Sequence, residues 1–164
     1  MSLALLVIDL QKAYFNFGLR KQELEKALQY INEASRLFRQ CDKPVVIVQH
    51  TSDTNKVGTP GFDVVNGLKV EDTDYRITKT ASNAFWDTEL EELLKDLDVE
   101  FVICAGFAAN HCVLFTYNGA KERGYKAAIL KNGLVGLENK HVTEVEELRD
   151  TICLDTIEFM LDRL

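Results

Sequence analysis

The sequence lacks the long apolar segments, paired cysteines and excess of basic residues that define several large classes of protein. No apolar run reaches the roughly 20 residues needed to cross a bilayer, so we expect no membrane partner. The formal net charge of −7 disfavours a nucleic-acid partner, because a phosphate backbone repels acidic surfaces. With three histidines and four cysteines but no Cys-x-x-Cys pair, the sequence shows no zinc-binding pattern, and no metal is expected.

The amino-terminal segment is apolar but has neither the basic start nor the small-residue cleavage site of a secretory signal. It is typical of a first buried strand. Without a secretion signal, the cysteines are expected to be reduced thiols in a cytoplasm. Cys104 and Cys153 lie in apolar runs and are interpreted as packing residues, whereas Cys41 follows a predicted helix.

Strand and helix signals alternate along the whole chain. Strands are predicted at 3–8, 45–48, 75–78, 101–105, 126–130 and 151–154, and the apolar runs 3–8, 45–48 and 101–105 are typical of strands buried on both faces. Apolar residues at helical spacing predict helices over 24–38, 90–97, 113–124, 142–148 and 157–164. This alternation is typical of right-handed βαβ units. The sequence therefore predicts one α/β domain over residues 1–164, a three-layer αβα sandwich with a six-stranded parallel sheet in the Rossmann-like order 3-2-1-4-5-6.

Local signals mark two helix starts and one long loop. Thr88 and Glu91 have the spacing of a capping box, and Asp155 is a candidate cap for the last helix. The stretch 51–74 is polar, contains several glycines and shows little periodicity, which indicates a loop. Because loops of this length in compact domains are usually functional, we expect this one to shape a ligand pocket.

Three chemically active side chains lie at the carboxyl ends of predicted strands. Asp9 ends the first strand, Lys79 follows the third and Cys112 follows the fourth. Ligands of open α/β sheets bind beyond these ends, where the strand order reverses. With strands one and four adjacent, Asp9 and Cys112 would face each other and Lys79 would reach in. Cys112 also lies at a strand-to-helix turn, where the helix dipole can lower the pKa of a thiol.

These residue types suit acyl transfer. A carboxylate beside a thiol can take its proton, and an ammonium group can orient the carboxylate and balance the charges. Backbone N–H groups in the turn can stabilise a tetrahedral oxyanion. Taken singly, each residue has an ordinary structural explanation: Asp9 can cap a turn, Lys79 can be solvated and Cys112 can be a packing residue. Their combination favours catalysis.

Three blocks of the sequence together resemble the isochorismatase-like cysteine hydrolases, which include nicotinamidases, N-carbamoyl amidohydrolases and isochorismatases. The blocks are Ala4 to Gln11, Lys79 to Phe85 with Thr88 and Leu90 downstream, and Gly106 to Val113 followed by Thr116, Ala120, Gly124 and Tyr125. Their order and separation agree with the family over nearly the whole chain. The resemblance implies a triad in which Cys112 is the nucleophile, Asp9 the general base and Lys79 the third member.

The resemblance also implies a cis peptide at Phe107-Ala108, in a turn whose N–H groups at Ala108 and Cys112 would form the oxyanion hole. Tyr14 and Phe107 flank the triad in sequence, and with Asn110 they are expected to contact the substrate. No cofactor is implied. Family members often form dimers or tetramers, so the resemblance implies a homo-oligomer.

The histidines bear on whether the site holds a metal, because nicotinamidases of this family share an Asp-x-His metal pair after the second strand. Here the segment Gln49-His50-Thr51-Ser52-Asp53 has no second histidine nearby. Metal sites normally need three or four convergent ligands. His50 is therefore interpreted as a hydrogen-bonding loop or pocket residue, and His111 as a residue that faces solvent or a neighbouring subunit.

The sequence thus predicts a cysteine-dependent hydrolase of a small-molecule amide or related C–N bond that acts through a thioester. Two alternatives stay open within the same fold. One is a non-catalytic protein that binds a small molecule or scaffolds a partner, and the other is a vinyl-ether hydrolase of the isochorismatase type. A thiol redox protein is a third alternative, although Cys112 has no resolving cysteine near it in the sequence.

Overall fold

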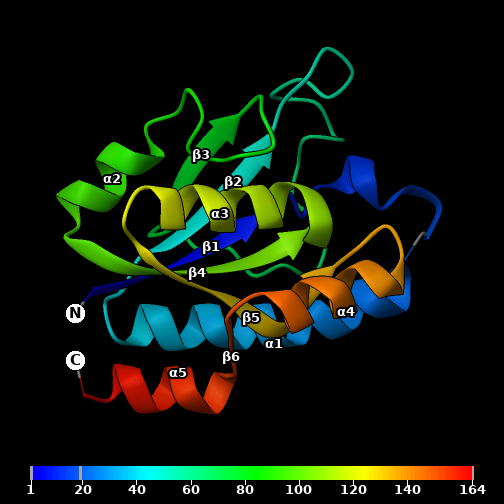
Figure 1. Ribbon diagram of the computed structural model, residues 1–164. Coiled ribbons are helices and arrows are strands. Elements are labelled where there is room, and N and C mark those ends of the chain that lie inside the picture. Colours follow the sequence, from blue (N-terminus) through cyan, green and yellow to red (C-terminus); the bar gives the residue numbers. More distant parts are fainter. Residues whose placement is uncertain (1, 19, 164) are drawn as a thin grey trace.

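A computed structural model describes residues 2–18 and 20–163, apart from the side chain of Phe17. Six parallel strands form one sheet in the order β3-β2-β1-β4-β5-β6, with helices on both faces (Figure 1). The strands are β1 (Ser2–Ile8), β2 (Val45–His50), β3 (Tyr75–Lys79), β4 (Val99–Phe107), β5 (Lys126–Val135) and β6 (Thr151–Ile152). The helices are α1 (Lys21–Gln40), α2 (Leu90–Asp96), α3 (Leu114–Glu122), α4 (Asn139–Leu148) and α5 (Leu154–Leu161). The predicted three-layer fold and strand order are confirmed.

β1 is continuously apolar because helices cover both of its faces. Its odd-numbered side chains pack in one core with α1 and α5, and its even-numbered side chains pack in a second core with α2 and α3. Successive side chains of a strand point to opposite faces, so a strand covered on both sides needs an apolar residue at every position. None of the helices in the described ranges is long and apolar enough to span a membrane.

Several predictions are wrong at the ends of elements. β5 runs on to Val135, because its register with β4 shifts between Cys104 and Gly106 and accommodates the polar residues 131–133. The capping box of α2 does not form, since Thr88 Oγ1 accepts from the N–H of Leu90 rather than from that of Glu91.

The start of α5 also differs from the prediction. The helix begins at Leu154, with Cys153 at the cap position, so Asp155 lies in the first turn and is not the cap. This early start turns the Cys153 side chain outward, and the cysteine is exposed rather than packed in the core. Leu164, which was expected to end the apolar face of this helix, lies outside the described residues.

Gly106 lets β4 pass close to the end of β1, next to the predicted site. Its φ is +118°, and a Cβ atom there would overlap the carbonyl oxygen of Ile8. We expect Gly106→Ala to lower the free energy of unfolding by about 3 kcal/mol or more, because the backbone must move. The matched control is Gly124→Ala. Its φ of +88° with nothing within 4 Å leaves only the conformational cost, about 1–2 kcal/mol. Urea unfolding measures both variants, and equal losses would contradict the overlap argument.

The stretch 51–74 is a loop, as predicted, and main-chain hydrogen bonds fasten it to the segment after β1. The N–H groups of Lys12 and Ala13 donate to the carbonyls of Asp63 and Gly61, at 2.9 and 3.0 Å. At the end of the loop, Arg39 of α1 holds the Asp74 carboxylate through two hydrogen bonds, of 2.9 and 2.7 Å. The loop is therefore anchored at its middle to the segment after β1 and at its end to α1.

Candidate active site

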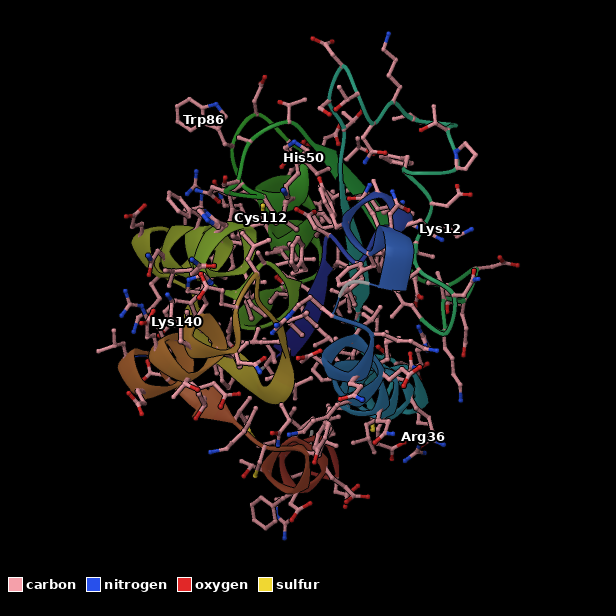
Figure 2. All side chains as sticks on the ribbon, turned by 90° about the vertical axis from the view of Figure 1, so that its right-hand side faces the viewer. Lys12, Arg36, His50, Trp86, Cys112 and Lys140 are labelled. Atoms are coloured by element: carbon pink, nitrogen blue, oxygen red, sulfur yellow. The ribbon has the colours of Figure 1, made fainter. Side chains whose placement is uncertain are left out.

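The structure brings Asp9, Lys79 and Cys112 together at the carboxyl edge of the sheet. Lys79 Nζ donates a hydrogen bond to Asp9 Oδ2 at 2.8 Å and lies 3.4 Å from Cys112 Sγ. Asp9 and Lys79 are each only 1% exposed, whereas Cys112 is half-buried. Figure 2 shows Cys112 and His50 at the same end of the molecule, where Trp86 projects outward. One ammonium group thus links the carboxylate to the sulfur.

The ends of three strands position these side chains. Asp9 directly follows β1 with a φ of 52°, and its N–H donates to the carbonyl of Val48 on β2. Lys79 is the last residue of β3 and pairs in register with His50. Cys112 lies in a π-helical turn, Ala109–Val113, between β4 and α3. Because β1 neighbours both β2 and β4, the strand order itself brings these ends together.

The turn before Cys112 contains the cis peptide bond Phe107-Ala108 that the family resemblance implied. The carbonyl of Ala108 accepts hydrogen bonds from the N–H groups of His111 and Val113, at 3.0 and 3.3 Å. These bonds fix the course of the turn around the sulfur. The assignment of the Ala108 and Cys112 N–H groups to an oxyanion hole stays a prediction.

The loop after Lys79 is seated on α3. The N–H of Ala84 donates to Thr116 Oγ1 at 3.0 Å, and both groups are buried. A Cβ atom added at Gly119 would lie 2.6 Å from the side-chain amide of Asn83, so the loop approaches the helix as closely as a glycine allows. These contacts explain why two separate sequence blocks belong together: one carries Lys79, the other carries Cys112, and each fixes the place of the other.

Aromatic rings and one amide surround the cluster. The ring of Phe107 lies 5.4 Å from that of Tyr14 and 5.1 Å from that of Phe15, between centroids. Burial, reinforced by the negative charges of Asp9 and Cys112, raises the pKa of Tyr14 to about 12, which places the phenol within electrostatic reach of both groups. Asn110 Oδ1 is buried without a hydrogen-bond partner among the described residues. Substrate contacts for Tyr14, Phe107 and Asn110 stay predictions.

The electrostatics of the site differ from the expectation for Cys112. Burial first, and then the charge of Asp9, raises the pKa of its thiol to about 11, against the opposing effect of Lys79. The expectation that the pKa of this thiol can be lowered is therefore wrong, because burial and the charge of Asp9 outweigh Lys79. Burial also raises the pKa of Asp9, and Lys79 opposes that rise. A thiol of this kind needs a base beside it. Asp9 Oδ1, buried and without a hydrogen-bond partner among the described residues, is an available acceptor.

Three of the four cysteines are expected to react with iodoacetamide in an order that burial and pKa determine. Cys153 should be labelled first at about pH 7, because it is exposed and its hydrogen bond with Thr156 lowers its thiol pKa. Labelling of Cys112 should rise with pH up to about 11, where its thiol ionises. Cys104, whose burial raises its pKa to about 12, should stay unlabelled in the folded protein. Peptide mass spectrometry over a pH series measures these rates, and fastest labelling of Cys112 at neutral pH would contradict them.

Two features beside the three candidate residues were not predicted from the sequence: the hydrogen bonds of Gln11 and the contact of His50 with the ammonium group of Lys79. Gln11 is fully buried. Its Nε2 donates to the carbonyls of His50 and Phe62, at 2.9 and 3.1 Å, and its Oε1 accepts from the N–H of His50 at 2.7 Å. A polar residue directly after an apolar strand was the only signal. His50 Nδ1 lies 3.2 Å from Lys79 Nζ, in keeping with the predicted hydrogen-bonding role. Within the described part of the chain, no three His, Cys, Asp or Glu side chains gather in a group that could hold a metal ion.

The fold and this site place the chain among the Rossmann-like α/β proteins that carry their functional groups at a strand-order reversal. The family model of the isochorismatase domain matches residues 3–157, and the chain belongs to the isochorismatase family. It has the hydrolase fold of that family.

Three similar proteins illustrate the relationship. An uncharacterized isochorismatase family protein of Bacillus subtilis, YrdC, is 30% identical over 133 residues, which cover 79% of this chain and 71% of that protein. An isochorismatase-like hydrolase from Alkaliphilus metalliredigens superposes with a TM-score of 0.85 at 21% identity, covering 98% of this chain and 99% of the other. N-carbamoylsarcosine amidase from Thermoplasma acidophilum gives a TM-score of 0.78 at 22% identity, over 90% and 92% of the two chains. The two structural likenesses show the fold.

Proposed function

We propose that this chain is a cysteine-dependent hydrolase of small-molecule amides or related C–N bonds, built as a single domain over residues 1–164. The observation that carries the proposal is the buried ammonium of Lys79, 2.8 Å from Asp9 Oδ2 and 3.4 Å from Cys112 Sγ. Burying a carboxylate, an ammonium and a thiol together is costly for folding, and such clusters are typical of functional sites. Family membership supports hydrolysis, and the amidase among the structural neighbours favours nitrogen substrates over vinyl ethers.

The first half of the reaction makes a thioester. Asp9 takes the proton from Cys112, and the thiolate sulfur bonds to the carbonyl carbon of the substrate. The N–H groups of Ala108 and Cys112 stabilise the negative charge that moves onto the carbonyl oxygen. When the tetrahedral intermediate collapses, the C–N bond breaks and Asp9 returns the proton to the departing nitrogen. Lys79 stays charged throughout and offsets the negative charge that passes between carboxylate and sulfur.

The second half consumes one water molecule. Asp9 is again a carboxylate. It takes a proton from water as the oxygen of the water molecule bonds to the thioester carbon. The C–S bond breaks, the sulfur recovers the proton from Asp9, and a carboxylic acid or carbamate leaves. The site returns to its starting protonation state, so the cycle needs no redox partner.

A substrate panel tests the proposal against its alternatives. The panel contains small primary amides, N-carbamoyl amines and one vinyl ether, with release of ammonia or amine and of carbonyl product measured separately. We expect turnover of at least one nitrogen substrate, and a mass increase on the Cys112 peptide after rapid acid quench. Turnover of the vinyl ether alone would favour an isochorismatase-type reaction. Binding without turnover of any compound would favour a non-catalytic protein.

A further inference from the structure

His50 lies beside Lys79 because of the register of two strands. The two residues are paired partners at the ends of β2 and β3, and the N–H of Thr51 closes the ladder by donating to the carbonyl of Lys79 at 2.9 Å. Paired residues of adjacent strands project from the same face of the sheet. The imidazole therefore reaches the ammonium from the side of β2, and Asp9 reaches it from the end of β1.

The main chain of His50 is held on both of its polar groups. Its N–H donates to Gln11 Oε1 at 2.7 Å, and its carbonyl accepts from Gln11 Nε2 at 2.9 Å and from Asn55 Nδ2 at 3.4 Å. Gln11 is fully buried and Asn55 is nearly so. Although His50 precedes a long loop, its ring is attached to a fixed point of the framework.

The chemistry of the ammonium group determines which role His50 Nδ1 takes in this contact. An ammonium group has three N–H donors and no acceptor. Lys79 Nζ lies 2.8 Å from Asp9 Oδ2, 3.0 Å from the carbonyl of Ala81 and 3.2 Å from His50 Nδ1. His50 Nδ1 must present its lone pair, so the ring is neutral and carries its proton on Nε2. These three nearest acceptors match the three hydrogens, and the longer contact with Cys112 Sγ, at 3.4 Å, is left to the charge of the ammonium.

We propose that His50 is a positioning residue, whose neutral imidazole accepts a hydrogen bond from Lys79 and so holds the ammonium between Asp9 and Cys112. The inference deepens the proposed function and rests on it, because the position of Lys79 matters only if Cys112 forms an anion. Protonation of His50 removes the acceptor and sets a second cation against the first. The site therefore loses its ammonium geometry in acid.

The charged groups that act on the imidazole are Lys79 on β3 and Asp9 after β1. Burial first, and then the charge of Lys79, holds the pKa of His50 below its usual 6.5, whereas Asp9 and the carbonyl of Ala81 oppose this effect. The ring consequently stays neutral at neutral pH. It becomes charged only as the pH falls below this lowered pKa, which is the direction in which activity should be lost.

Two substitutions at His50 separate hydrogen bonding from charge. His50→Leu removes the acceptor, and we expect kcat to fall about 10- to 100-fold with KM changed less than about threefold. His50→Asn offers an amide oxygen near the place of Nδ1 and cannot be protonated, so it should restore most of kcat. The matched control is His141→Asn on α4, which should behave as the wild type. Loss of activity in His50→Asn equal to that in His50→Leu would overturn the hydrogen-bond role.

The pH profile supplies a readout that a purely structural role would not move. In the wild type, log kcat/KM should steepen from a slope of about one to about two below the pKa values of both Asp9 and His50. In His50→Asn only Asp9 titrates, so the slope should stay near one. Identical acid limbs in the two proteins would contradict the proposal.

Alkylation of Cys112 tests the inference without any substrate. In His50→Leu the ammonium is no longer held beside the sulfur, so the pH midpoint of labelling should rise by roughly half a unit, with no change in His50→Asn. This shift would support the positioning role of His50 even if no panel compound were hydrolysed. The failure to hydrolyse any compound would count against the proposed reaction and not against the role of His50. Hydrolysis by the wild type, together with a His50→Leu variant unchanged in rate and labelling midpoint, would overturn the role of His50 alone.

Discussion

Replacing Cys112 with alanine is expected to lower hydrolysis by at least roughly 10⁴-fold, because the atom that bonds to the substrate is lost. The fold should persist. The thiol is half-buried, and Lys79 keeps its oxygen acceptors on Asp9 and Ala81 when the sulfur is removed. We therefore expect the free energy of unfolding to change by less than about 1 kcal/mol. Steady-state turnover and urea unfolding of the same preparation measure the two effects.

The matched control for this prediction is Cys153→Ala. Cys153 is the exposed cysteine with the lowered thiol pKa, so any activity that depended on general thiol reactivity would disappear with it. We expect full turnover in this variant. A Cys112→Ala protein that keeps more than about one hundredth of the activity would rule out covalent catalysis at this sulfur.

Lys79→Met is expected to reduce stability more than any other single change at the site, by about 3–5 kcal/mol at neutral pH. The Lys79 side chain is completely buried against the side chain of Asp9, which is 2% exposed. Methionine has a similar length but no charge, so the loss comes from the carboxylate that it leaves buried without its cation. Activity should be lost as well, because no cation then faces the thiolate.

The direction in which stability changes with pH shows whether the buried charge of Asp9 causes this loss. In Lys79→Met, burial acts on the pKa of Asp9 without the lysine, so the folded value rises further above the ordinary 3.8. The folded state then binds a proton more tightly than the unfolded state, and stability falls as the pH rises through the interval between the two pKa values. The destabilisation should shrink as the pH falls and should be smallest below 3.8, where Asp9 is mostly neutral in both states.

A double variant serves as the control for this second prediction. Asp9→Asn combined with Lys79→Met removes both charges, and we expect it to recover most of the lost stability at neutral pH and to lose the steep pH dependence. Urea unfolding at several pH values gives both quantities. Packing rather than charge would be responsible if Lys79→Met lost the same stability at every pH and if adding Asp9→Asn failed to restore it.

The central strands could be predicted because a strand that is buried on both faces is continuously apolar, as in 3–8. Their order could be predicted because strands and helices alternate along the chain, which is typical of a Rossmann-like sheet. Asp9 and Cys112 could be found because each follows such an apolar run, whereas Lys79 could be found only from its place at the end of the short mixed strand β3. The raised pKa of the Cys112 thiol could not be predicted from the sequence. It depends on how deeply Cys112 is buried and on its distance from the carboxylate of Asp9, 103 positions away in the sequence. The contact of His50 with Lys79 depends on the β2–β3 register, which neither run specifies alone.

The single side chain of Gln11 binds the main chain at both His50 and Phe62, on either side of the loop tip at 56–60. The loop is therefore constrained at the carbonyls of these two residues, and also at Asn55 and Gly61 between them, whereas no described residue of the tip itself makes a contact of this kind with Gln11 or Ala13. A library that varies the exposed tip while keeping the positions of His50 and Phe62 would leave both Gln11 hydrogen bonds in place beside Asp9 and Lys79. Insertions that move those two carbonyls apart in space would instead break a Gln11 hydrogen bond at the carboxyl edge of the sheet.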